Sequence, residues 1–283
     1  MLKPIRIIPR LDIKGPNLVK GIHLEGLRIL GKPEQFAKFY YQNGADEIIY
    51  QDVVASLYDR NSLHDIVSKT AKEIFIPLTV GGGIRTIDDI KDVLRAGADK
   101  VSINTAAIRN PEFISNASQI FGSSTITVAI EAIKQNDGKY LAFMDNGREY
   151  SGLEIVSWAK TVEELGAGEI IITSVDREGI GEGFDCELIK SVVEAVNIPV
   201  IAHGGCGNLN HIVEAIKCSQ IDGIAIASIL HYDFIKNNRM LEGYEAEGNI
   251  DFLKSGKNFS KVESCSIEHI KTYLHKNGIN CRF

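Results

Sequence analysis

The chain repeats part of itself. Glu47–Pro77 opens with Glu-Ile-Ile-Tyr and closes with Ile-Pro, and Glu169–Pro199 opens with Glu-Ile-Ile-Ile and closes with Ile-Pro. The two copies lie 122 residues apart (169 − 47), and at the same offset Gly81-Gly82-Gly83 aligns with His203-Gly204-Gly205. A repeat of this length is a duplicated half-domain, because each copy holds several strands and helices. Equivalent strand ends in the two halves are therefore expected to build one site with matching functional groups.

Short apolar runs rich in Ile and Val alternate with longer stretches whose apolar residues have helical spacing, such as Thr86–Ala96 and Asp185–Val196. Strands this apolar, separated by helices, predict a parallel sheet covered by helices. Eight strands in two similar halves predict a closed (βα)8 TIM barrel, formed as one domain by residues 1–283, rather than an open sheet with two distinct edges. The expected strands are Arg6–Asp12, Glu47–Asp52, Ile76–Val80, Lys100–Asn104, Thr125–Glu131, Glu169–Ser174, Ile198–His203 and Gly223–Ala227.

Two segments interrupt this regular pattern. Residues 133–150 contain the turn signals Asn136-Asp-Gly and Asp145-Asn-Gly, which predict a hairpin inserted after the fifth strand. Residues 236–264 are polar and weakly periodic, and they precede a final helix around Ser266–Lys276. We expect this second segment to lie on the barrel surface, and no function is assigned to it.

Composition excludes several classes of function. The net charge of −6 and the absence of a basic stripe argue against binding to nucleic acid or to a membrane surface. The sequence shows no signal peptide and no apolar run of spanning length. Its five cysteines are odd in number and form no Cys-x-x-Cys pair, so free thiols in a reducing cytoplasm are expected.

Functional groups of such barrels lie at the carboxyl ends of the strands, where the loops to the helices begin. Two glycine turns stand there, and each is followed by a strand that ends in a small hydroxyl residue, Thr105 or Ser228. Free backbone N–H groups at such turns suit phosphate, although one turn alone is equally well explained as a tight connection. The duplication favours a ligand with two phosphates. The residues at the strand ends are Asp12, Asp52, Gly81, Gly82, Gly83, Asn104, Thr105, Glu131, Ser174, Asp176, Glu178, His203, Gly204, Gly205, Ala227 and Ser228.

Asp12 and Glu131 end strands that face each other across an eight-stranded barrel. Two carboxylates placed in this way can act as general acid and general base on opposite faces of one ligand. The alternative is a metal site built from carboxylates, but no histidine pair has ligand spacing, and no metal or other cofactor is expected. The carboxylates of that alternative are Asp12, Asp52, Glu131 and Glu178. His203 either contacts the ligand or supports the glycine turn, and its position at a strand end favours the first.

Four charged residues stand at or near strand starts: Arg6, Glu47, Lys100 and Glu169. Two cations and two anions at the opposite end of the barrel are expected to converge in a ring. Such a ring closes the lower end of the barrel, and a small polar molecule such as ammonia is the kind of species it would admit.

Several motifs resemble the cyclase subunit of imidazole glycerol phosphate synthase over residues 1 to about 235 and again at the last helix. The motifs are Arg6-Ile-Ile-Pro-Arg-Leu-Asp12, Val19-Lys20-Gly21, Val80-Gly-Gly-Gly-Ile84, Gly97-Ala-Asp-Lys-Val-Ser-Ile-Asn-Thr-Ala106, Gly166-Ala-Gly-Glu169, Thr173-Ser174 and Asp176-Arg177. The resemblance implies a barrel with a glutaminase subunit at its lower face, whose ammonia passes a charged gate and reaches a doubly phosphorylated substrate at the upper face.

The same resemblance implies roles for individual residues. Arg6, Glu47, Lys100 and Glu169 fall on the ammonia gate, and Asp12 falls on one of two catalytic aspartates. Lys20 falls on a mobile first loop that helps to close over the substrate. The substrate and phosphate positions fall on Asp52, Gly82, Gly83, Asn104, Thr105, Thr173, Ser174, Asp176, Glu178, His203, Gly204, Gly205, Ala227 and Ser228.

The departures from the family pattern lie around the upper end. Glu131 replaces the second catalytic aspartate, Glu178 replaces another aspartate, and His203 replaces a serine. The added methylene at position 131 moves the carboxyl group by roughly 1.5 Å, and a misplacement on this scale can cost about a hundredfold in rate. The first loop, Lys14–Leu18, lacks the usual Asp-Gly-Arg.

An intact gate beside an altered upper end is typical of paralogues from bacterial surface-polysaccharide pathways, which the chain resembles at Leu11–Arg28, Ile130–Ala132 and Asp145–Arg148. These are thought to supply ammonia to a separate ATP-dependent amidotransferase that makes acetamidino sugars. This is the leading interpretation from sequence. The alternatives are a true histidine-pathway cyclase (a lyase) that tolerates Glu131, and a scaffold that passes ammonia without chemistry of its own.

Overall fold

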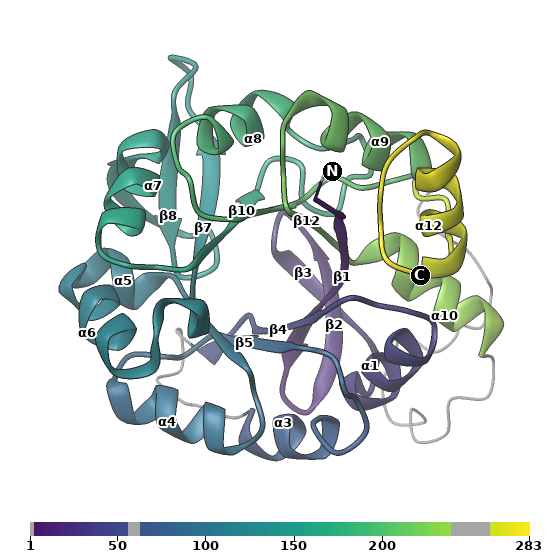
Figure 1. Ribbon diagram of the computed structural model, residues 1–283, viewed down its shortest axis with the longest axis horizontal. Helices are drawn as coiled ribbons and strands as arrows, with labels where there is room; N and C mark the ends of the chain where they lie inside the picture. Colours follow the sequence, from purple (N-terminus) through teal and green to yellow (C-terminus); the bar gives the residue numbers. More distant parts are fainter. Residues whose placement is uncertain (1–2, 56–62, 239–260) are drawn as a thin grey trace.

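The computed structural model describes residues 3–55, 63–238 and 261–283 of the 283-residue chain. Eight parallel strands form a closed ring in the order β1-β4-β5-β6-β7-β10-β11-β12, with β12 pairing back to β1 and helices lying outside the ring (Figure 1). The predicted (βα)8 barrel is confirmed. The ring strands are β1 (Arg6–Lys14), β4 (Ile48–Asp52), β5 (Leu78–Gly81), β6 (Lys100–Ile103), β7 (Ile126–Lys134), β10 (Glu169–Ser174), β11 (Val200–His203) and β12 (Gly223–Ile226).

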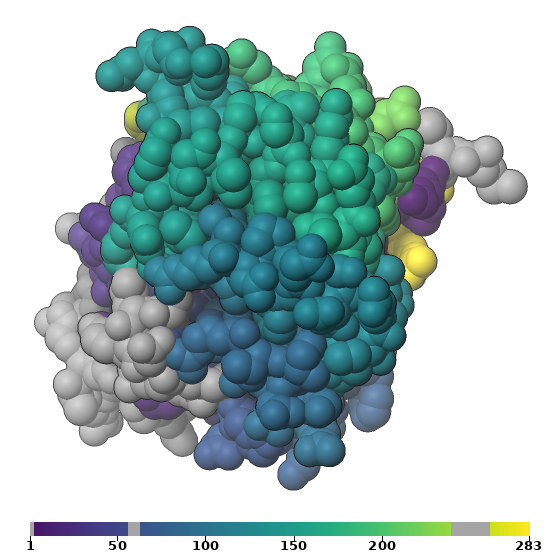
Figure 2. All heavy atoms as spheres, turned by 90° about the vertical axis from the view of Figure 1, so that its left-hand side faces the viewer, coloured from purple at the N-terminus to yellow at the C-terminus, as the bar shows by residue number. Residues whose placement is uncertain are grey.

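The outer layer consists of helices, most of which are amphipathic and cover the sheet with their apolar side, whereas α10 (Ser228–Asn237) is buried on nearly all sides. Figure 2 shows one side of this wall, and at its upper left the turn between β7 and β8 projects beyond the helices. The helices are α1 (Pro33–Gln42), α3 (His64–Thr70), α4 (Ile87–Arg95), α5 (Thr105–Arg109), α6 (Glu112–Phe121), α7 (Ile155–Glu164), α8 (Cys186–Val193), α9 (Leu209–Cys218), α10 (Ser228–Asn237) and α12 (Ile267–Lys276).

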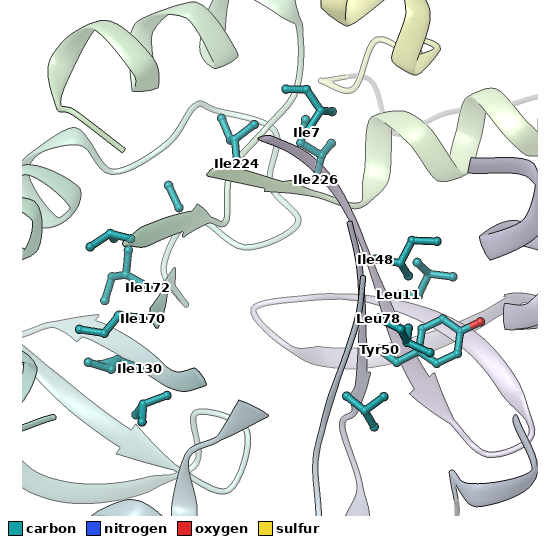
Figure 3. Close-up of a cluster of buried hydrophobic side chains, with 14 of the residues drawn as sticks. Ile7, Leu11, Ile48, Tyr50, Leu78, Ile130, Ile170, Ile172, Ile224 and Ile226 are labelled. Atoms are coloured by element: carbon teal, nitrogen blue, oxygen red, sulfur yellow. The ribbon is translucent and has the colours of Figure 1, made fainter. Parts of the chain in front are cut away.

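Alternation along each strand separates two apolar regions. Outward side chains such as Leu11, Tyr50 and Ile172 join the large core between sheet and helices (Figure 3). Inward side chains form a second, small layer inside the ring. Its members are Ile8, Ile49, Ile171, Ile201 and Ala225. Period-two alternation is what a strand requires when both of its faces are buried, and it explains why these strands read as continuous apolar runs.

Two hairpins extend the upper end of the barrel. The first comprises β2 (Asn17–Ile22) and β3 (Glu25–Gly31), and it follows β1 directly. The second comprises β8 (Tyr140–Met144) and β9 (Glu149–Glu154), which continue antiparallel from β7. Most of the segment 236–264, for which a surface excursion is expected, lies outside the described residues.

Candidate functional site

The four charged residues near the strand starts meet at the lower end of the barrel. Arg6 Nη1 lies 2.9 Å from Glu47 Oε2, and Arg6 Nη2 lies 2.5 Å from Glu169 Oε1. Lys100 Nζ lies 3.1 Å from Glu47 Oε1 and 3.0 Å from Glu169 Oε2. Cations and anions therefore alternate around a ring in which each charge has two opposite neighbours. Both carboxylates are buried, whereas the cation side chains keep about a fifth of their surface (20% and 19%) exposed.

The inward face of β1 connects the two ends of the barrel. Its side chains run from Arg6 through Ile8 and Arg10 to Asp12, in steps of about 6.6 Å. Ile8 belongs to the aliphatic layer, so a charged ring, an apolar layer and a charged upper layer follow one another along the axis. A small neutral molecule would meet these three environments in that order.

A cavity of about 250 Å³ opens at the upper end. Its walls come from the ends of β4 to β7 and from the β8–β9 turn, and none of them comes from β10, β11 or β12. The lining residues are Gln51, Asp52, Gly82, Gly83, Ile84, Arg85, Ser102, Ile103, Asn104, Thr105, Ala106, Arg109, Asn110, Glu131 and Asn146. Most of the lining therefore comes from the first half of the chain, including its glycine turn and Thr105, while Glu131 and Asn146 are contributed by the start of the second half.

The two glycine turns are built alike. Gly82 has φ +97°, and a Cβ there would lie 2.3 Å from the backbone oxygen of Asp52. Gly204 has φ +100°, and a Cβ there would lie 2.6 Å from the backbone oxygen of Ser174. Each glycine thus packs against the end of the preceding ring strand at a repeat-equivalent position. Only glycine combines this positive φ with so close an approach.

Glu131 forms part of the cavity wall and is 5% exposed. Its Oε2 accepts hydrogen bonds from Asn104 Nδ2 at 3.0 Å and from the backbone N–H of Gly147 at 2.8 Å. Burial raises the pKa of Glu131 to about 7, although Arg10 and the Gly147 N–H oppose the shift. A carboxyl group with this pKa exchanges a proton readily near neutral pH.

Arg10 occupies the part of the upper end that lies beside β10 and β11. Its Nε lies 2.9 Å from Asp12 Oδ1, and its Nη1 lies 3.2 Å from Thr173 Oγ1 and 3.1 Å from His203 Nδ1. Burial, together with the charges of Arg10 and Lys20, holds the pKa of His203 well below its usual range. The imidazole is therefore neutral, and its Nδ1 accepts the hydrogen bond because a guanidinium only donates. His203 is the repeat equivalent of Gly81, where a Cβ would lie 2.4 Å from Gln51 Oε1, so the side chain of Gln51 takes the space that glycine leaves.

The first hairpin is fixed across the upper end by Glu178. The Glu178 carboxylate forms a buried ion pair with Lys20 and accepts a 2.9 Å hydrogen bond from the backbone N–H of Leu24. His23 Nδ1 lies 2.9 Å from the backbone oxygen of Val175. Together with a 3.0 Å hydrogen bond from the backbone N–H of His23 to the backbone oxygen of Glu178, these contacts join the hairpin that follows β1 to the loop that follows β10.

Other candidate residues are placed elsewhere at the upper end. Asp176 turns towards the end of β7 and accepts from the backbone N–H of Lys134 at 2.8 Å. Thr105 Oγ1 accepts from the backbone N–H of Asp145 at 3.0 Å and lies 3.2 Å from its carboxylate. Ala227 and Ser228 lie at the end of β12, so the structure does not bring them into the cavity that Thr105 lines.

Sequence reasoning did not single out Arg10, the cavity residues Gln51 and Arg85, or the hairpin formed by β2 and β3. The Gly15-Pro16 pair was the available turn signal for that hairpin. For Arg10, the signal was an arginine two residues before Asp12 on an otherwise apolar strand, which places both on the inward face.

The carboxylates considered for a metal are engaged in other contacts: Asp12 with Arg10, Glu178 with Lys20, and Glu131 with two N–H donors. In residues 3–55, 63–238 and 261–283, no group of three or more His, Cys, Asp and Glu side chains is arranged to hold a metal ion. Within the same ranges, no helix has both the length and the apolar character needed to span a membrane.

Comparison of the sequence with known proteins identifies a family and several relatives. A profile of the family described as "Histidine biosynthesis protein" matches residues 6–236. A protein of Legionella pneumophila is 56% identical over 72% of this chain and 97% of its own length. Proteins of Clostridium botulinum (strain 657 / Type Ba4) and Methanopyrus kandleri are 42% and 48% identical, over 98% and 80% of this chain and 98% and 90% of their own lengths. All three are named imidazole glycerol phosphate synthase subunit HisF.

Proposed function

The chain belongs to the histidine biosynthesis protein family, and from this premise we propose that it is an ammonia-dependent cyclase of the imidazole glycerol phosphate synthase type. In this proposal, a glutaminase partner docks at the lower face and delivers ammonia into the barrel. The acceptor is a doubly phosphorylated substrate bound at the upper face. From sequence alone this function was an alternative to the surface-polysaccharide role, and the names of the relatives favour it.

The observation that carries this proposal is the alternating ring at the lower end, coaxial with carboxylates at the upper end. Ammonia would pass between Arg6, Glu47, Lys100 and Glu169, whose ion pairs would have to part to admit it. It would then cross the aliphatic layer, which favours the neutral molecule over ammonium because burying an unpaired charge is costly.

Two carboxyl groups are available for proton transfer at the upper end. Glu131, whose pKa is raised to about 7 by burial, is the group suited to donate and regain a proton near neutral pH. Asp12 is held in one orientation by the guanidinium of Arg10 and serves as the second carboxylate. The glycine turn at Gly82 and Gly83, together with Thr105, is proposed to bind one phosphate of the substrate in the cavity.

The test is to incubate the purified chain with the histidine-pathway cyclase substrate and excess ammonium salts, and to follow product by mass spectrometry. We expect turnover, and we expect Asp12→Asn to abolish it, whereas Glu194→Gln, at an exposed residue that follows α8, should match the wild type. No turnover from a folded protein would contradict the proposal.

A second candidate keeps the ammonia pathway but changes its destination. Here the barrel and its glutaminase serve a separate ATP-dependent amidotransferase that modifies a surface-polysaccharide sugar. The replacements at Glu131, Glu178 and His203 favour it, as does the way in which Arg10 occupies the part of the upper end that lies beside β10 and β11. Its test is complementation: the gene would restore the polysaccharide in a strain lacking it and would fail to restore growth without histidine.

A non-catalytic conduit is a limiting case of that candidate. It predicts that Asp12→Asn leaves the pathway output unchanged while Lys100→Ala alters it.

All five cysteines are free thiols, which supports a reducing cytoplasm as the compartment for any of these activities.

A further inference from the structure

The guanidinium of Arg10 is enclosed in the barrel interior, and the residue is 3% exposed. Its Nε and Nη1 are engaged by Asp12, Thr173 and His203, all of which lie on inward faces. Its Nη2 has no hydrogen-bond partner among the described residues. Leaving a buried donor unsatisfied costs about 1–3 kcal/mol, so this arrangement indicates a donor that is kept for a molecule other than the protein.

The surrounding charges restrict what that molecule presents to Nη2. Arg10 is already neutralised by Asp12, and His203 is uncharged at neutral pH. The carboxyl group of Glu131 acts on the same region, and when it is ionised it raises the cost of bringing in another negative charge. A neutral acceptor oxygen avoids that repulsion and still satisfies the donor.

The position along the axis is equally specific. On the inward face of β1, Arg10 lies one step of about 6.6 Å above Ile8 in the aliphatic layer and one such step below Asp12. The free donor therefore lies where a molecule rising through the barrel meets a ligand that enters from the upper end. It also lies outside the wall of the cavity that the first glycine turn lines.

We propose that Arg10 is a ligand-binding residue that donates a hydrogen bond from Nη2 to a neutral oxygen, a carbonyl or a hydroxyl, of a phosphorylated sugar-like ligand. The phosphate of that ligand lies in the cavity of the first half, and its carbon chain extends towards β1. This inference rests on the proposed function for the class of ligand, but it does not depend on turnover.

The test uses the full chain labelled with ¹⁵N at the arginine guanidinium groups, with the Arg10 signals assigned by their loss in Arg10→Lys. The probes are ribulose 5-phosphate, which carries a carbonyl, hydroxyls and a phosphate, and inorganic phosphate alone. We expect ribulose 5-phosphate to shift the Arg10 Nη signal and inorganic phosphate to leave it unchanged. An equal shift with both probes would show an anion site, and no shift with either would show that Nη2 binds no such ligand; both results overturn the proposal.

Calorimetry with the same probes gives a second measurement. Arg10→Lys keeps a cation beside Asp12 but removes Nη2, so it should weaken ribulose 5-phosphate binding about tenfold, the value of one hydrogen bond. Inorganic phosphate should bind Arg10→Lys and wild type alike, and Arg95→Lys, at an exposed arginine of α4, should bind both probes as wild type does. Unchanged binding of ribulose 5-phosphate to Arg10→Lys would overturn the proposal.

The outcomes separate this inference from the proposed function. A chain that does not cyclise the histidine-pathway substrate, but whose Arg10 signal responds to ribulose 5-phosphate, contradicts the function and supports the inference. A chain that cyclises that substrate with an unresponsive Arg10 does the reverse.

Discussion

The two ends of the barrel use charge in opposite ways. At the lower end, Arg6, Glu47, Lys100 and Glu169 satisfy one another in a closed alternating ring. At the upper end, Arg10 keeps an unpaired Nη2, Asn104 keeps an unpaired Oδ1, and burial raises the pKa of Glu131 to about 7. A saturated ring is a stable closure that opens at a cost, whereas unused donors and a perturbed carboxyl group are suited to binding and proton transfer. The difference separates the entry of a small molecule from its chemistry.

The largest effect is expected at the upper end. Glu131→Gln keeps the shape of the side chain and its acceptor oxygen but removes the exchangeable proton. We expect cyclase turnover with ammonium salts to fall about a thousandfold, within the range for loss of a general acid or base. Steady-state kinetics with Glu194→Gln as the exposed control measures this change. Turnover within a few-fold of wild type would remove Glu131 from the chemistry.

At the lower end, Lys100→Met removes one cation of the ring and leaves Arg6 as the cation that Glu47 and Glu169 share. Breaking a buried ion pair in this way should lower the free energy of unfolding by about 4 kcal/mol, as measured by urea denaturation. Glutamine-dependent activity with the glutaminase partner should fall, while activity with ammonium salts should persist in the folded fraction. Lys190→Met, at an exposed lysine of α8, is the matched control. Equal loss of both activities would argue against a gate.

Glu131 at the upper end should also make the free energy of unfolding depend on pH. Because the pKa of Glu131 is raised from 4.5 to about 7 in the folded state, the folded protein holds a proton that the unfolded chain has released between those values. The free energy of unfolding should therefore fall by about 3 kcal/mol as pH rises through that window. Glu131→Gln should lack this component, so the difference between the two unfolding curves, measured across the window, isolates it. Parallel curves would contradict a buried, protonated Glu131.

The smallest effect is expected just outside the ring. Lys3 pairs with Asp222 at 2.7 Å, but the Lys3 side chain is 78% exposed. Lys3→Ala should change the free energy of unfolding by less than about 0.5 kcal/mol, because exposed ion pairs contribute little. Thermal or urea unfolding beside Lys100→Met makes the contrast direct. If Lys3→Ala lowered the free energy of unfolding as much as Lys100→Met does, the ion pairs within the ring would not be the source of the larger effect.

Much of the fold followed from local pattern. The runs of Ile and Val at the eight strands, and the 122-residue offset between Gly82 and Gly204, predicted the closed barrel and its paired turns (204 − 82). The ring of charges was also expected, because inward side chains at the starts of parallel strands converge at the same end of a closed barrel. These features depend on period and position along the chain, which a sequence displays directly.

The barrel, its two glycine turns and the residues available at each end can therefore be inferred from the chain alone. How those residues are used depends on contacts that form only in the folded molecule. Arg10 contacts His203 across 193 positions of sequence, and the cavity is lined by Gly82 and Gly83 but not by their repeat equivalents Gly204 and Gly205. Which inward side chains meet, and which donor is left free, depends on side-chain length and packing across the closed ring, and no local pattern records those contacts.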